Sequence, residues 1–322
     1  MKKVIISFLC ISALVSIGLM LGRAQAQEAK KREVTGRHVY TISSLTDLAA
    51  VTIIGRNDLP EGSGKGKGKG KGDDEGEKLE IEIEGEDITL DRISGYNHDI
   101  NNKNTLIGSN NKPGISTDVE ADTEDFKIDD DVLVAGVPSP VVYEIDPIAV
   151  KDYVNYYKDH ANFTVDSPGL TQWGTSNSKG GPTDYKVVYV KNSKLKLYQD
   201  FKGYGILVLY DDTPGAGKAE LRMEDTATWY GLIISYTEDT SGESDKIKIS
   251  LGNGSSGEGK GKGKGSPGTG VTVLGSILLE TREGEIKLDL ADVYYCKQAM
   301  DNVDSLVNTK MKFQWEKYKE PR

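Results

Sequence analysis

The residues that could perform chemistry are few and lie far apart along the chain. His38, His98 and His160 are the three histidines, and none has the spacing of an HExxH motif or of another metal-ligand motif. Cys296 is one of two cysteines, and it lies in an apolar, strand-like run that is typical of a buried structural thiol. No GxSxG, Walker or paired-cysteine motif occurs. We therefore predict no catalytic residue and no cofactor.

Two oxygen-rich stretches are candidates for a calcium site, because hard cations prefer carboxylate and amide oxygens. One stretch alternates polar side chains, and the other is a dense acidic turn. Neither has the spaced ligands and closing Glu of an EF-hand. The calcium candidates are Asn97, Asp99, Asn101, Asp129, Asp130 and Asp131.

Carboxylates in alternating strands raise the alternative of a carbohydrate-active enzyme. Such chemistry needs acidic groups that converge on one face of the fold. The available acids are Glu220, Glu224, Asp225 and Asp289. Their positions opposite apolar residues are equally expected for solvent-facing partners of a buried strand face, so no site can be assigned from them.

Two Gly-Lys tracts indicate loops or cationic arms. Glycine loses most entropy on ordering and like-charged lysines repel, so neither tract is expected to fold alone. As arms they would bind polyanions; as repeat expansions they would be exposed loops. The acidic run 73–77 follows the first tract and would partly neutralise it. The polyanion-binding candidates are Lys65, Lys67, Lys69, Lys71, Lys260, Lys262 and Lys264.

The first 26 residues have the order of regions found in a secretory signal peptide. Lys2 and Lys3 precede an apolar run, and Ala24-Gln25-Ala26 supplies a small-x-small cleavage site. The alternative is a retained anchor, because the run approaches the ~20 residues that span a bilayer. We predict an exported protein of the periplasm, cell surface or extracellular space, without a membrane span after cleavage.

The charge balance excludes a general affinity for nucleic acid. The chain has 40 basic and 50 acidic residues, for a net charge of -10. Cleavage after Ala26 would remove three basic residues and no acids, which lowers the net charge to -13. A chain of this sign repels DNA, RNA and anionic lipid. It would also lose Cys10, so Cys296 would have no partner for an intramolecular disulfide.

Three copies of one unit, a glycine followed by an apolar strand, begin at Gly205, Gly231 and Gly275. The first interval is 26 residues and the second is 44, and the second contains a Gly-Lys tract. Removing an insertion of about 18 residues restores the period. Alternating strands lie between the copies, as they also do over residues 79–93. A period in the twenties is typical of a solenoid.

One amphipathic helix is predicted near residues 147–161. Asp146-Pro147 offers an N-cap followed by proline at the first helical position. Val150, Tyr153, Val154 and Tyr157 then fall at helical spacing.

Together these patterns predict a mainly β chain that forms a right-handed parallel β-helix-like solenoid with one short helix, or alternatively a β-sandwich. The predicted division is a signal peptide (1–26), an N-terminal segment with the first tract (27–78), a β-rich repeat domain (79–301) with a Gly-Lys loop near 252–270, and a C-terminal tail (302–322).

The repeat region resembles the C-terminal part of PilX-like, type IV pilus-associated proteins of bacteria. The resemblance rests on Gly203–Val208, Trp229–Ile234, Leu274–Leu278 and Asp292–Tyr295, which follow the family's order of "GxGILVV", "WxGLII", "GAIL"-like and "YYS" steps. It covers roughly residues 93–301 and includes Ile93–Asp99. No Gly-Phe-Thr-like prepilin junction is present, so the chain looks like the family's exported domain on an ordinary signal peptide.

The predicted function is an exported, non-enzymatic structural or adhesive protein of the cell envelope. The resemblance implies pilus or cell-surface proteins as partners, and envelope polysaccharide is a further candidate. The alternatives are a carbohydrate-binding or carbohydrate-active β-helix, and a polyanion-binding module that acts through the Gly-Lys tracts.

Overall fold

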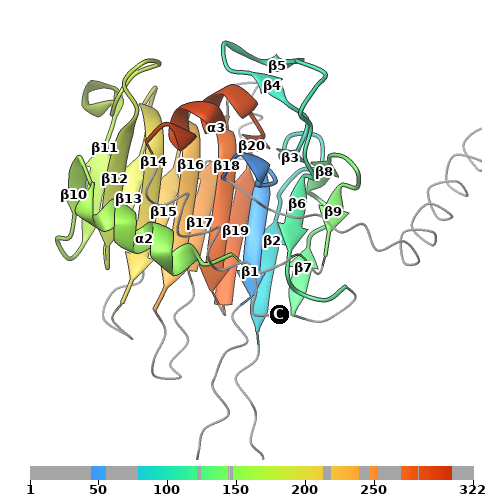
Figure 1. The fold of residues 1–322 in the computed structure, drawn as a ribbon, viewed down its shortest axis with the longest axis horizontal. Coiled ribbons are helices and arrows are strands. Elements are labelled where there is room, and N and C mark those ends of the chain that lie inside the picture. Colours follow the sequence, from blue (N-terminus) through green and yellow to red (C-terminus); the bar gives the residue numbers. More distant parts are fainter. Residues whose placement is uncertain are drawn as a thin grey trace, which may run out of the picture. The chain divides into compact units, whose positions relative to one another are not determined.

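Parallel strand pairing dominates the chain (Figure 1). The computed structural model describes residues 45–55, 79–121, 125–143, 145, 148–212, 219–238, 247–252, 270–281 and 283–306. These residues are mainly β, as the sequence predicted. They all belong to one unit that spans Thr41–Arg322.

The strands form two long sheets, A and B, and a two-stranded hairpin. The main path of sheet A runs in the order β10 (Phe163–Val165), β12 (Lys186–Lys191), β14 (Lys202–Asp211), β16 (Thr228–Thr237), β18 (Val271–Thr281), β1 (Val51–Gly55), β6 (Ile115–Thr117) and β9 (Val141–Val142). Sheet B runs β11 (Leu170–Trp173), β13 (Lys194–Leu197), β15 (Glu220–Met223), β17 (Ile247–Gly252), β19 (Glu283–Asp289), β2 (Glu80–Glu84) and β7 (Phe126–Ile128). The antiparallel hairpin is β4 (His98–Asp99) and β5 (Asn102–Leu106).

Sheet A forks within β18, at Gly275. Residues 271–274 pair with β20 (Ala291–Tyr294), which continues to β3 (Arg92–Ser94) and β8 (Leu133–Ala135), whereas residues 277–281 pair with β1. The glycines of the three predicted units lie at the same register, Gly205 beside Gly231 and Gly231 beside Gly275. Their φ angles of 134°, 131° and 152° favour glycine. The equivalence of the three units, predicted from spacing alone, is therefore confirmed by the pairing.

Apolar side chains fill the space between the sheets. Sheet B alternates buried and more exposed positions, with Leu221 and Met223 on the buried side of β15 and Ile249 and Leu251 on that of β17. The second halves of β14, β16 and β18 are buried on both faces, because part of sheet A is also covered from outside.

The covering element is α2 (Val150–Asp159), which lies across the strands of sheet A (Figure 1). It follows β9 in the chain and precedes β10, yet these strands are at opposite ends of the main path. Seven strand steps of about 4.8 Å separate them, roughly 34 Å in all. The helix and its flanking segments therefore form the connection across the sheet.

The predicted helix is confirmed, and its start is corrected. Val150, Tyr153, Val154 and Tyr157 are buried, as their spacing indicated. The N-cap is Ala149, without a side-chain capping bond, whereas Asp146 had been expected to cap the helix. Asp146 and Pro147 lie outside the described residues.

A second helix, α3 (Lys297–Asp304), was not predicted and crosses the expected boundary between repeat domain and tail at residues 301 and 302. It buries Ala299, Met300 and Val303 and contacts β14, β16 and β18. Cys296 is its N-cap rather than part of a strand. The thiol is fully buried, and burial raises its pKa to about 11, which agrees with the structural role predicted for it.

Two short 3-10 helices, η1 (Leu45–Asp47) and η2 (Thr175–Asn177), complete the described elements. Strand β1 belongs to the segment 27–78 in the predicted division, yet it pairs with β18 and β6. No helix in the described part of the chain is both long and apolar enough to cross a bilayer. The predicted signal peptide and both Gly-Lys tracts lie outside the described residues.

Candidate functional site

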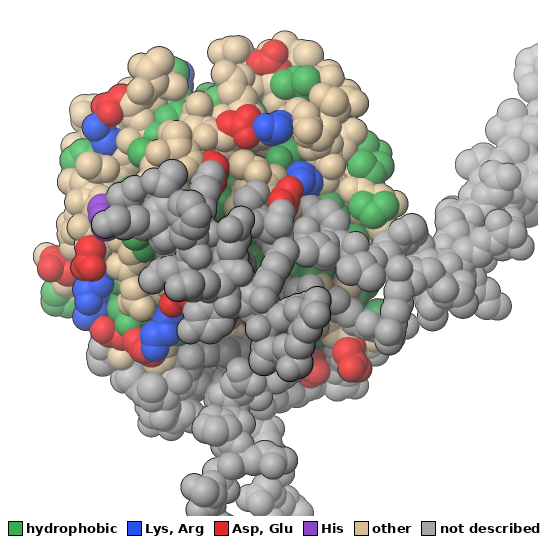
Figure 2. Space-filling view, in the orientation of Figure 1, with side chains coloured by type: hydrophobic (Ala, Val, Ile, Leu, Met, Phe, Trp, Pro, Cys, Tyr) green, Lys and Arg blue, Asp and Glu red, His purple; other side chains and the backbone are tan. Residues whose placement is uncertain are grey.

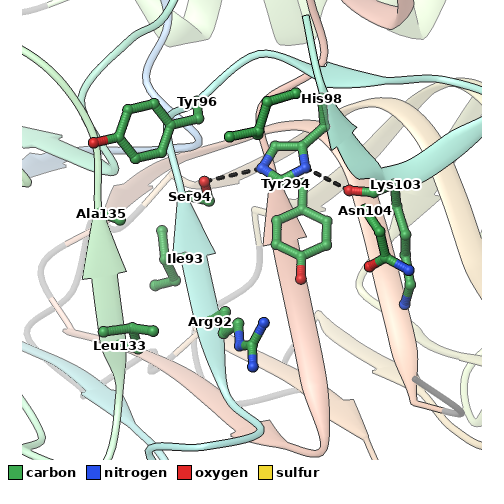
Figure 3. Close-up of a pocket in the computed structure, with 11 residues that line it drawn as sticks. Arg92, Ile93, Ser94, Tyr96, His98, Lys103, Asn104, Leu133, Ala135 and Tyr294 are labelled. Atoms are coloured by element: carbon green, nitrogen blue, oxygen red, sulfur yellow. Dashed lines mark hydrogen bonds between the residues drawn. The ribbon is translucent and has the colours of Figure 1, made fainter. Parts of the chain in front are cut away.

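A surface pocket of about 430 Å³ lies where the hairpin β4–β5 meets the branch of sheet A formed by β20, β3 and β8 (Figure 3). Its walls combine a cation, aromatic rings, hydrogen-bonding groups and apolar side chains. It is lined by Arg92, Ile93, Ser94, Tyr96, His98, Lys103, Asn104, Leu106, Leu133, Ala135 and Tyr294.

The hairpin is fixed to strands that are distant in sequence. Lys103 Nζ donates to Thr272 Oγ1 at 2.8 Å and to Asp292 Oδ2 at 3.1 Å. The backbone N–H of Lys297 donates to Asn97 Oδ1 at 2.9 Å, and that of His98 donates to the carbonyl of Tyr295 at 2.9 Å. These bonds hold one wall of the pocket in place.

His98 is locked in one orientation by two hydrogen bonds (Figure 3). The carbonyl of Lys103 can only accept, so Nδ1 carries the proton that it receives. Nε2 is then the acceptor, and Ser94 Oγ donates to it at 3.0 Å. Burial lowers the pKa of His98, although the Lys103 carbonyl and the Asp292 carboxylate oppose that shift. The ring is accordingly neutral near pH 7.

Tyr294 forms the aromatic wall of the pocket. The ring of His98 stacks on it with centroids 4.1 Å apart and an interplanar angle of 15°. Its hydroxyl lies on the side of the ring that faces Arg92 (Figure 3). Burial raises the pKa of Tyr294, and the nearby Asp292 carboxylate adds to this, so the hydroxyl stays protonated.

Arg92 supplies the positive charge of the pocket. Its side chain is exposed, and Nη2 donates to the carbonyl of Thr89 at 3.0 Å. The second cation, Lys103, is engaged by Asp292, so these two charges offset one another. The net charge of Arg92, Lys103 and Asp292 together is therefore the single positive charge of the Arg92 guanidinium.

The contact of Ser94 with His98 resembles one half of a nucleophilic hydrolase site. In such sites the second ring nitrogen is held by a group that stabilises the imidazolium, most often a carboxylate. Here a backbone carbonyl takes that place. The pair is therefore better suited to hold the ring rigid than to activate the serine.

The calcium candidates are divided between two places and are engaged in local hydrogen bonds. Asn97 is buried and its Oδ1 accepts from the backbone of Lys297, while Asp99 Oδ1 accepts from the N–H of Asn101 at 2.8 Å. Asp129 Oδ1 accepts from the N–H of Asp131 at 3.1 Å, in the turn between β7 and β8 that also contains Asp130. Among the described residues, no three His, Cys, Asp or Glu side chains are grouped as metal ligands.

The carboxylates of sheet B are paired with cations along the outer face. Lys194 lies beside Glu220 in register, and Lys248 lies beside Glu285. The corresponding ion pairs measure 3.0 Å and 2.6 Å. Lys196 pairs at 2.6 Å with Glu224, which lies just beyond the end of β15. The face drawn in Figure 2 likewise shows acidic and basic side chains next to one another where it is not covered.

Glu220 differs from the solvent-facing role expected of it, since only 5 % of its side chain is exposed. Burial alone would raise its pKa, but hydrogen bonds from Arg222 and Lys194 outweigh that effect and lower it. Asp289 has a raised pKa because it is partly desolvated and lies near Glu86 and Asp91. These acids do not converge on one site, in contrast to the paired carboxylates of a glycosidase.

Sequence reasoning did not identify the pocket. His98 had been set aside because no other histidine lies near it in sequence. Arg92, Lys103 and Tyr294 carry no motif, and the pocket arises only when β20 pairs with β3, across about two hundred residues. The polyanion-binding lysines lie outside the described residues, so their assignment stays a prediction.

The comparisons with known proteins give no relative from which a site could be transferred. No protein-family model, no curated protein and no solved structure matches this chain.

Proposed function

We propose that this chain is an exported, non-enzymatic structural or adhesive protein of the bacterial cell envelope, related to type IV pilus-associated proteins. The observation that carries the proposal is the stacking of the resembling segments. The glycine of each unit lies beside the glycine of the next in β14, β16 and β18, and the terminal Tyr-Tyr step begins in β20, beside β18. Segments that follow one another in the resemblance are therefore neighbours in space, in the same order.

The architecture we propose is a right-handed parallel β-helix-like solenoid. Along β10–β19 the chain alternates between the two sheets, and each strand pairs with the strand two places later. The branch β20–β3–β8 would form a third side. In a β-sandwich the strands pair antiparallel, whereas every pair in sheets A and B is parallel. Parallel crossovers are right-handed in nearly all proteins, which favours that hand here.

A non-enzymatic role is supported by the charge arrangement of sheet B. Glu220, Glu224 and Glu285 are each held by a lysine, and the pocket contains no pair of carboxylates. A structural or adhesive surface requires defined shape and charge rather than a reactive group.

The test is a fractionation and attachment experiment on the full chain produced with its own leader in a bacterial host. We expect the protein in the envelope or the medium, with Gln27 as its first residue. We also expect cells that carry it to attach to a surface more strongly than cells without it. Retention in the cytoplasm, or release of sugar products from polysaccharides by the purified chain, would overturn the proposal.

Carbohydrate binding is the second candidate function, and the pocket favours it. Its exposed apolar side chains, Leu106 and Leu133, lie beside polar groups and a cation, and this combination suits a sugar, which has both apolar C–H faces and hydroxyl edges. Binding of this kind is compatible with an adhesive role.

A further inference from the structure

The pocket at the hairpin has the size and the openness to solvent that a small ligand requires. Its volume of about 430 Å³ lies near the lower end of the roughly 300–1,000 Å³ that is usual for small-molecule sites. Arg92 and Asn104 on its rim are exposed, whereas Ser94 and His98 deeper in the pocket are largely buried. A ligand would therefore meet the cation first and the rings below it.

The charge of the pocket selects an anion. Asp292 is paired with Lys103 at 3.1 Å, so its negative charge does not oppose a second anion strongly. Arg92 has five N–H donors; Nη2 donates to the carbonyl of Thr89, and the guanidinium also donates to the Tyr294 hydroxyl. The guanidinium can thus present a fork of donors, and this geometry matches a carboxylate in a bidentate manner.

The other walls select a ligand with an apolar face. Leu106 and Leu133 are 54 % and 44 % exposed, and they are two of the six large hydrophobic side chains that are exposed among the described residues. Tyr96 lines the side opposite the Tyr294–His98 stack (Figure 3). A simple phosphate or sulfate would leave these surfaces unused, whereas a sugar ring would cover them.

The site is preorganised, which favours binding. The hairpin is held by Lys103, and His98 is held by Ser94 and by the Lys103 carbonyl. A wall that is ordered before binding loses little conformational entropy when the ligand arrives.

We propose that this pocket binds a carboxylated sugar residue of an acidic polysaccharide, with the carboxylate on Arg92 and the ring against the exposed side chains of Leu106 and Leu133. This assignment rests on the proposed adhesive function and specifies its ligand. Hydroxyl groups of the sugar would meet Asn104, which is exposed and lines the same pocket.

The test is calorimetric titration of the mature chain with tri-galacturonate and with its fully methyl-esterified form. We expect tri-galacturonate to bind at least tenfold more tightly than the ester, because a charge-assisted hydrogen bond is lost in the ester. Arg92→Gln should weaken tri-galacturonate by roughly the same factor and leave the ester unchanged. Lys202→Gln is the matched control, because Lys202 is exposed and aligns with Arg92 along the register of sheet A but does not line the pocket.

Leu133→Ala removes an exposed apolar wall of the pocket and should weaken both ligands by a similar, smaller factor. Circular dichroism of each variant checks that it is folded. The assignment is overturned if tri-galacturonate and its ester bind with equal affinity, or if Arg92→Gln leaves tri-galacturonate binding unchanged. It is also overturned if the chain binds a peptide with a free C-terminal carboxylate but not tri-galacturonate. If cells still attach through the protein while tri-galacturonate does not bind, the pocket assignment fails and the adhesive function stands.

Discussion

In β16 of sheet A, the backbone of Gly231 approaches the carbonyl of Gly205 in β14 so closely that a side chain has no space. A Cβ added at Gly231 would lie 2.1 Å from that oxygen, and the residue has φ of +131°. Gly169 has a similar φ of +118°, but nothing lies within 4 Å of its added Cβ. The two positions therefore separate the strain of the backbone angle from the steric clash.

We predict that Gly231→Ala lowers the free energy of unfolding by at least about 2 kcal/mol more than Gly169→Ala does. Both variants bear the strain of a positive φ, and only the first forces two stacked strands apart. Urea unfolding followed by circular dichroism measures the difference. Equal losses in the two variants would show that the close approach at Gly231 is relieved at little energy.

Glu220 gives a prediction about pH. Its pKa in the folded chain is lower than its usual value of 4.5, so its ionised form is stabilised by folding. This contribution is present above the unfolded pKa and is lost as the pH falls through the folded pKa. Glu220→Gln should therefore lower the free energy of unfolding by about 1–3 kcal/mol at pH 7.

The loss from Glu220→Gln should shrink as unfolding is repeated at successively lower pH, since the native carboxyl becomes protonated once the pH falls through its lowered pKa. Glu224→Gln is the control, because its ion pair with Lys196 is 22–25 % exposed and should contribute about 0–1 kcal/mol. A loss from Glu220→Gln that does not change with pH would contradict the assigned pKa.

Individual residues differ in how far the sequence determines their role. The alignment of Gly205, Gly231 and Gly275 could be predicted, because each glycine is followed by a similar, mostly apolar run. The meeting of Arg92 with Tyr294 could not be predicted, since it depends on the pairing of β3 with β20. Short polar segments do not contain the periodic signal that identifies a strand and its partner.

Among the elements, α2 is held to sheet A by aromatic packing and by a few polar contacts. Lys151 pairs with Glu238, which also accepts a hydrogen bond from the hydroxyl of Tyr210. Tyr157 is fully buried, and its hydroxyl has no hydrogen-bond partner among the described residues. Desolvation raises the pKa of this hydroxyl well above its usual value.

We predict that Tyr157→Phe leaves stability unchanged or raises it by up to about 1 kcal/mol, because a buried hydroxyl without a partner is removed. Tyr157→Ala should instead lower stability by about 3–5 kcal/mol through the cavity it creates. Thermal unfolding of both variants provides the measurement. A clear loss of stability in Tyr157→Phe would reveal a hydrogen bond to an ordered water.

The two helices show why element boundaries are harder to predict than elements. The stripe from Val150 to Tyr157 is long enough to identify α2, but the helix begins at Val150 with Ala149 as its N-cap, three residues after the proline that was expected to open it. The eight residues of α3 carry only three buried side chains, so their sequence pattern is weak.

For the molecule as a whole, the repeat can be tested by removing one unit. Deleting Gly205–Tyr230 joins Tyr204 to Gly231, and the register already places Tyr204 beside Tyr230 and Gly205 beside Gly231. If the strands form a solenoid, β12 can pair with the spliced strand and β13 with β17, so the sheets close again. We predict a folded chain that unfolds cooperatively and has the circular dichroism of a β protein.

The control is a deletion of Gly205–Trp229, which retains one residue more and so shifts the spliced strand by one position of the register. It should abolish cooperative unfolding, because a shift in register exposes the core side chains. Loss of folding in both deletions would argue against independent, equivalent units and in favour of an architecture in which every strand is required.

The mainly β class and the repeat could be predicted from the sequence, whereas the order of strands could not. Nothing in Val51–Gly55 indicates that β1 lies between β18 and β6. Pairing across more than two hundred residues leaves no local pattern, since each strand shows only that one face is buried.

The position of β1 also constrains when the chain can fold. Its partner Ile277 is synthesised long after Val51, and the hydrogen bond from Ser276 to the carbonyl of Ala49 joins residues 227 positions apart. The edge of β1 that pairs with β18 therefore stays unpaired until the C-terminal strands have left the ribosome. Such late closure slows folding. If the chain is exported as we propose, this delay is an advantage, because the sheet is completed only after its last strands have crossed the membrane.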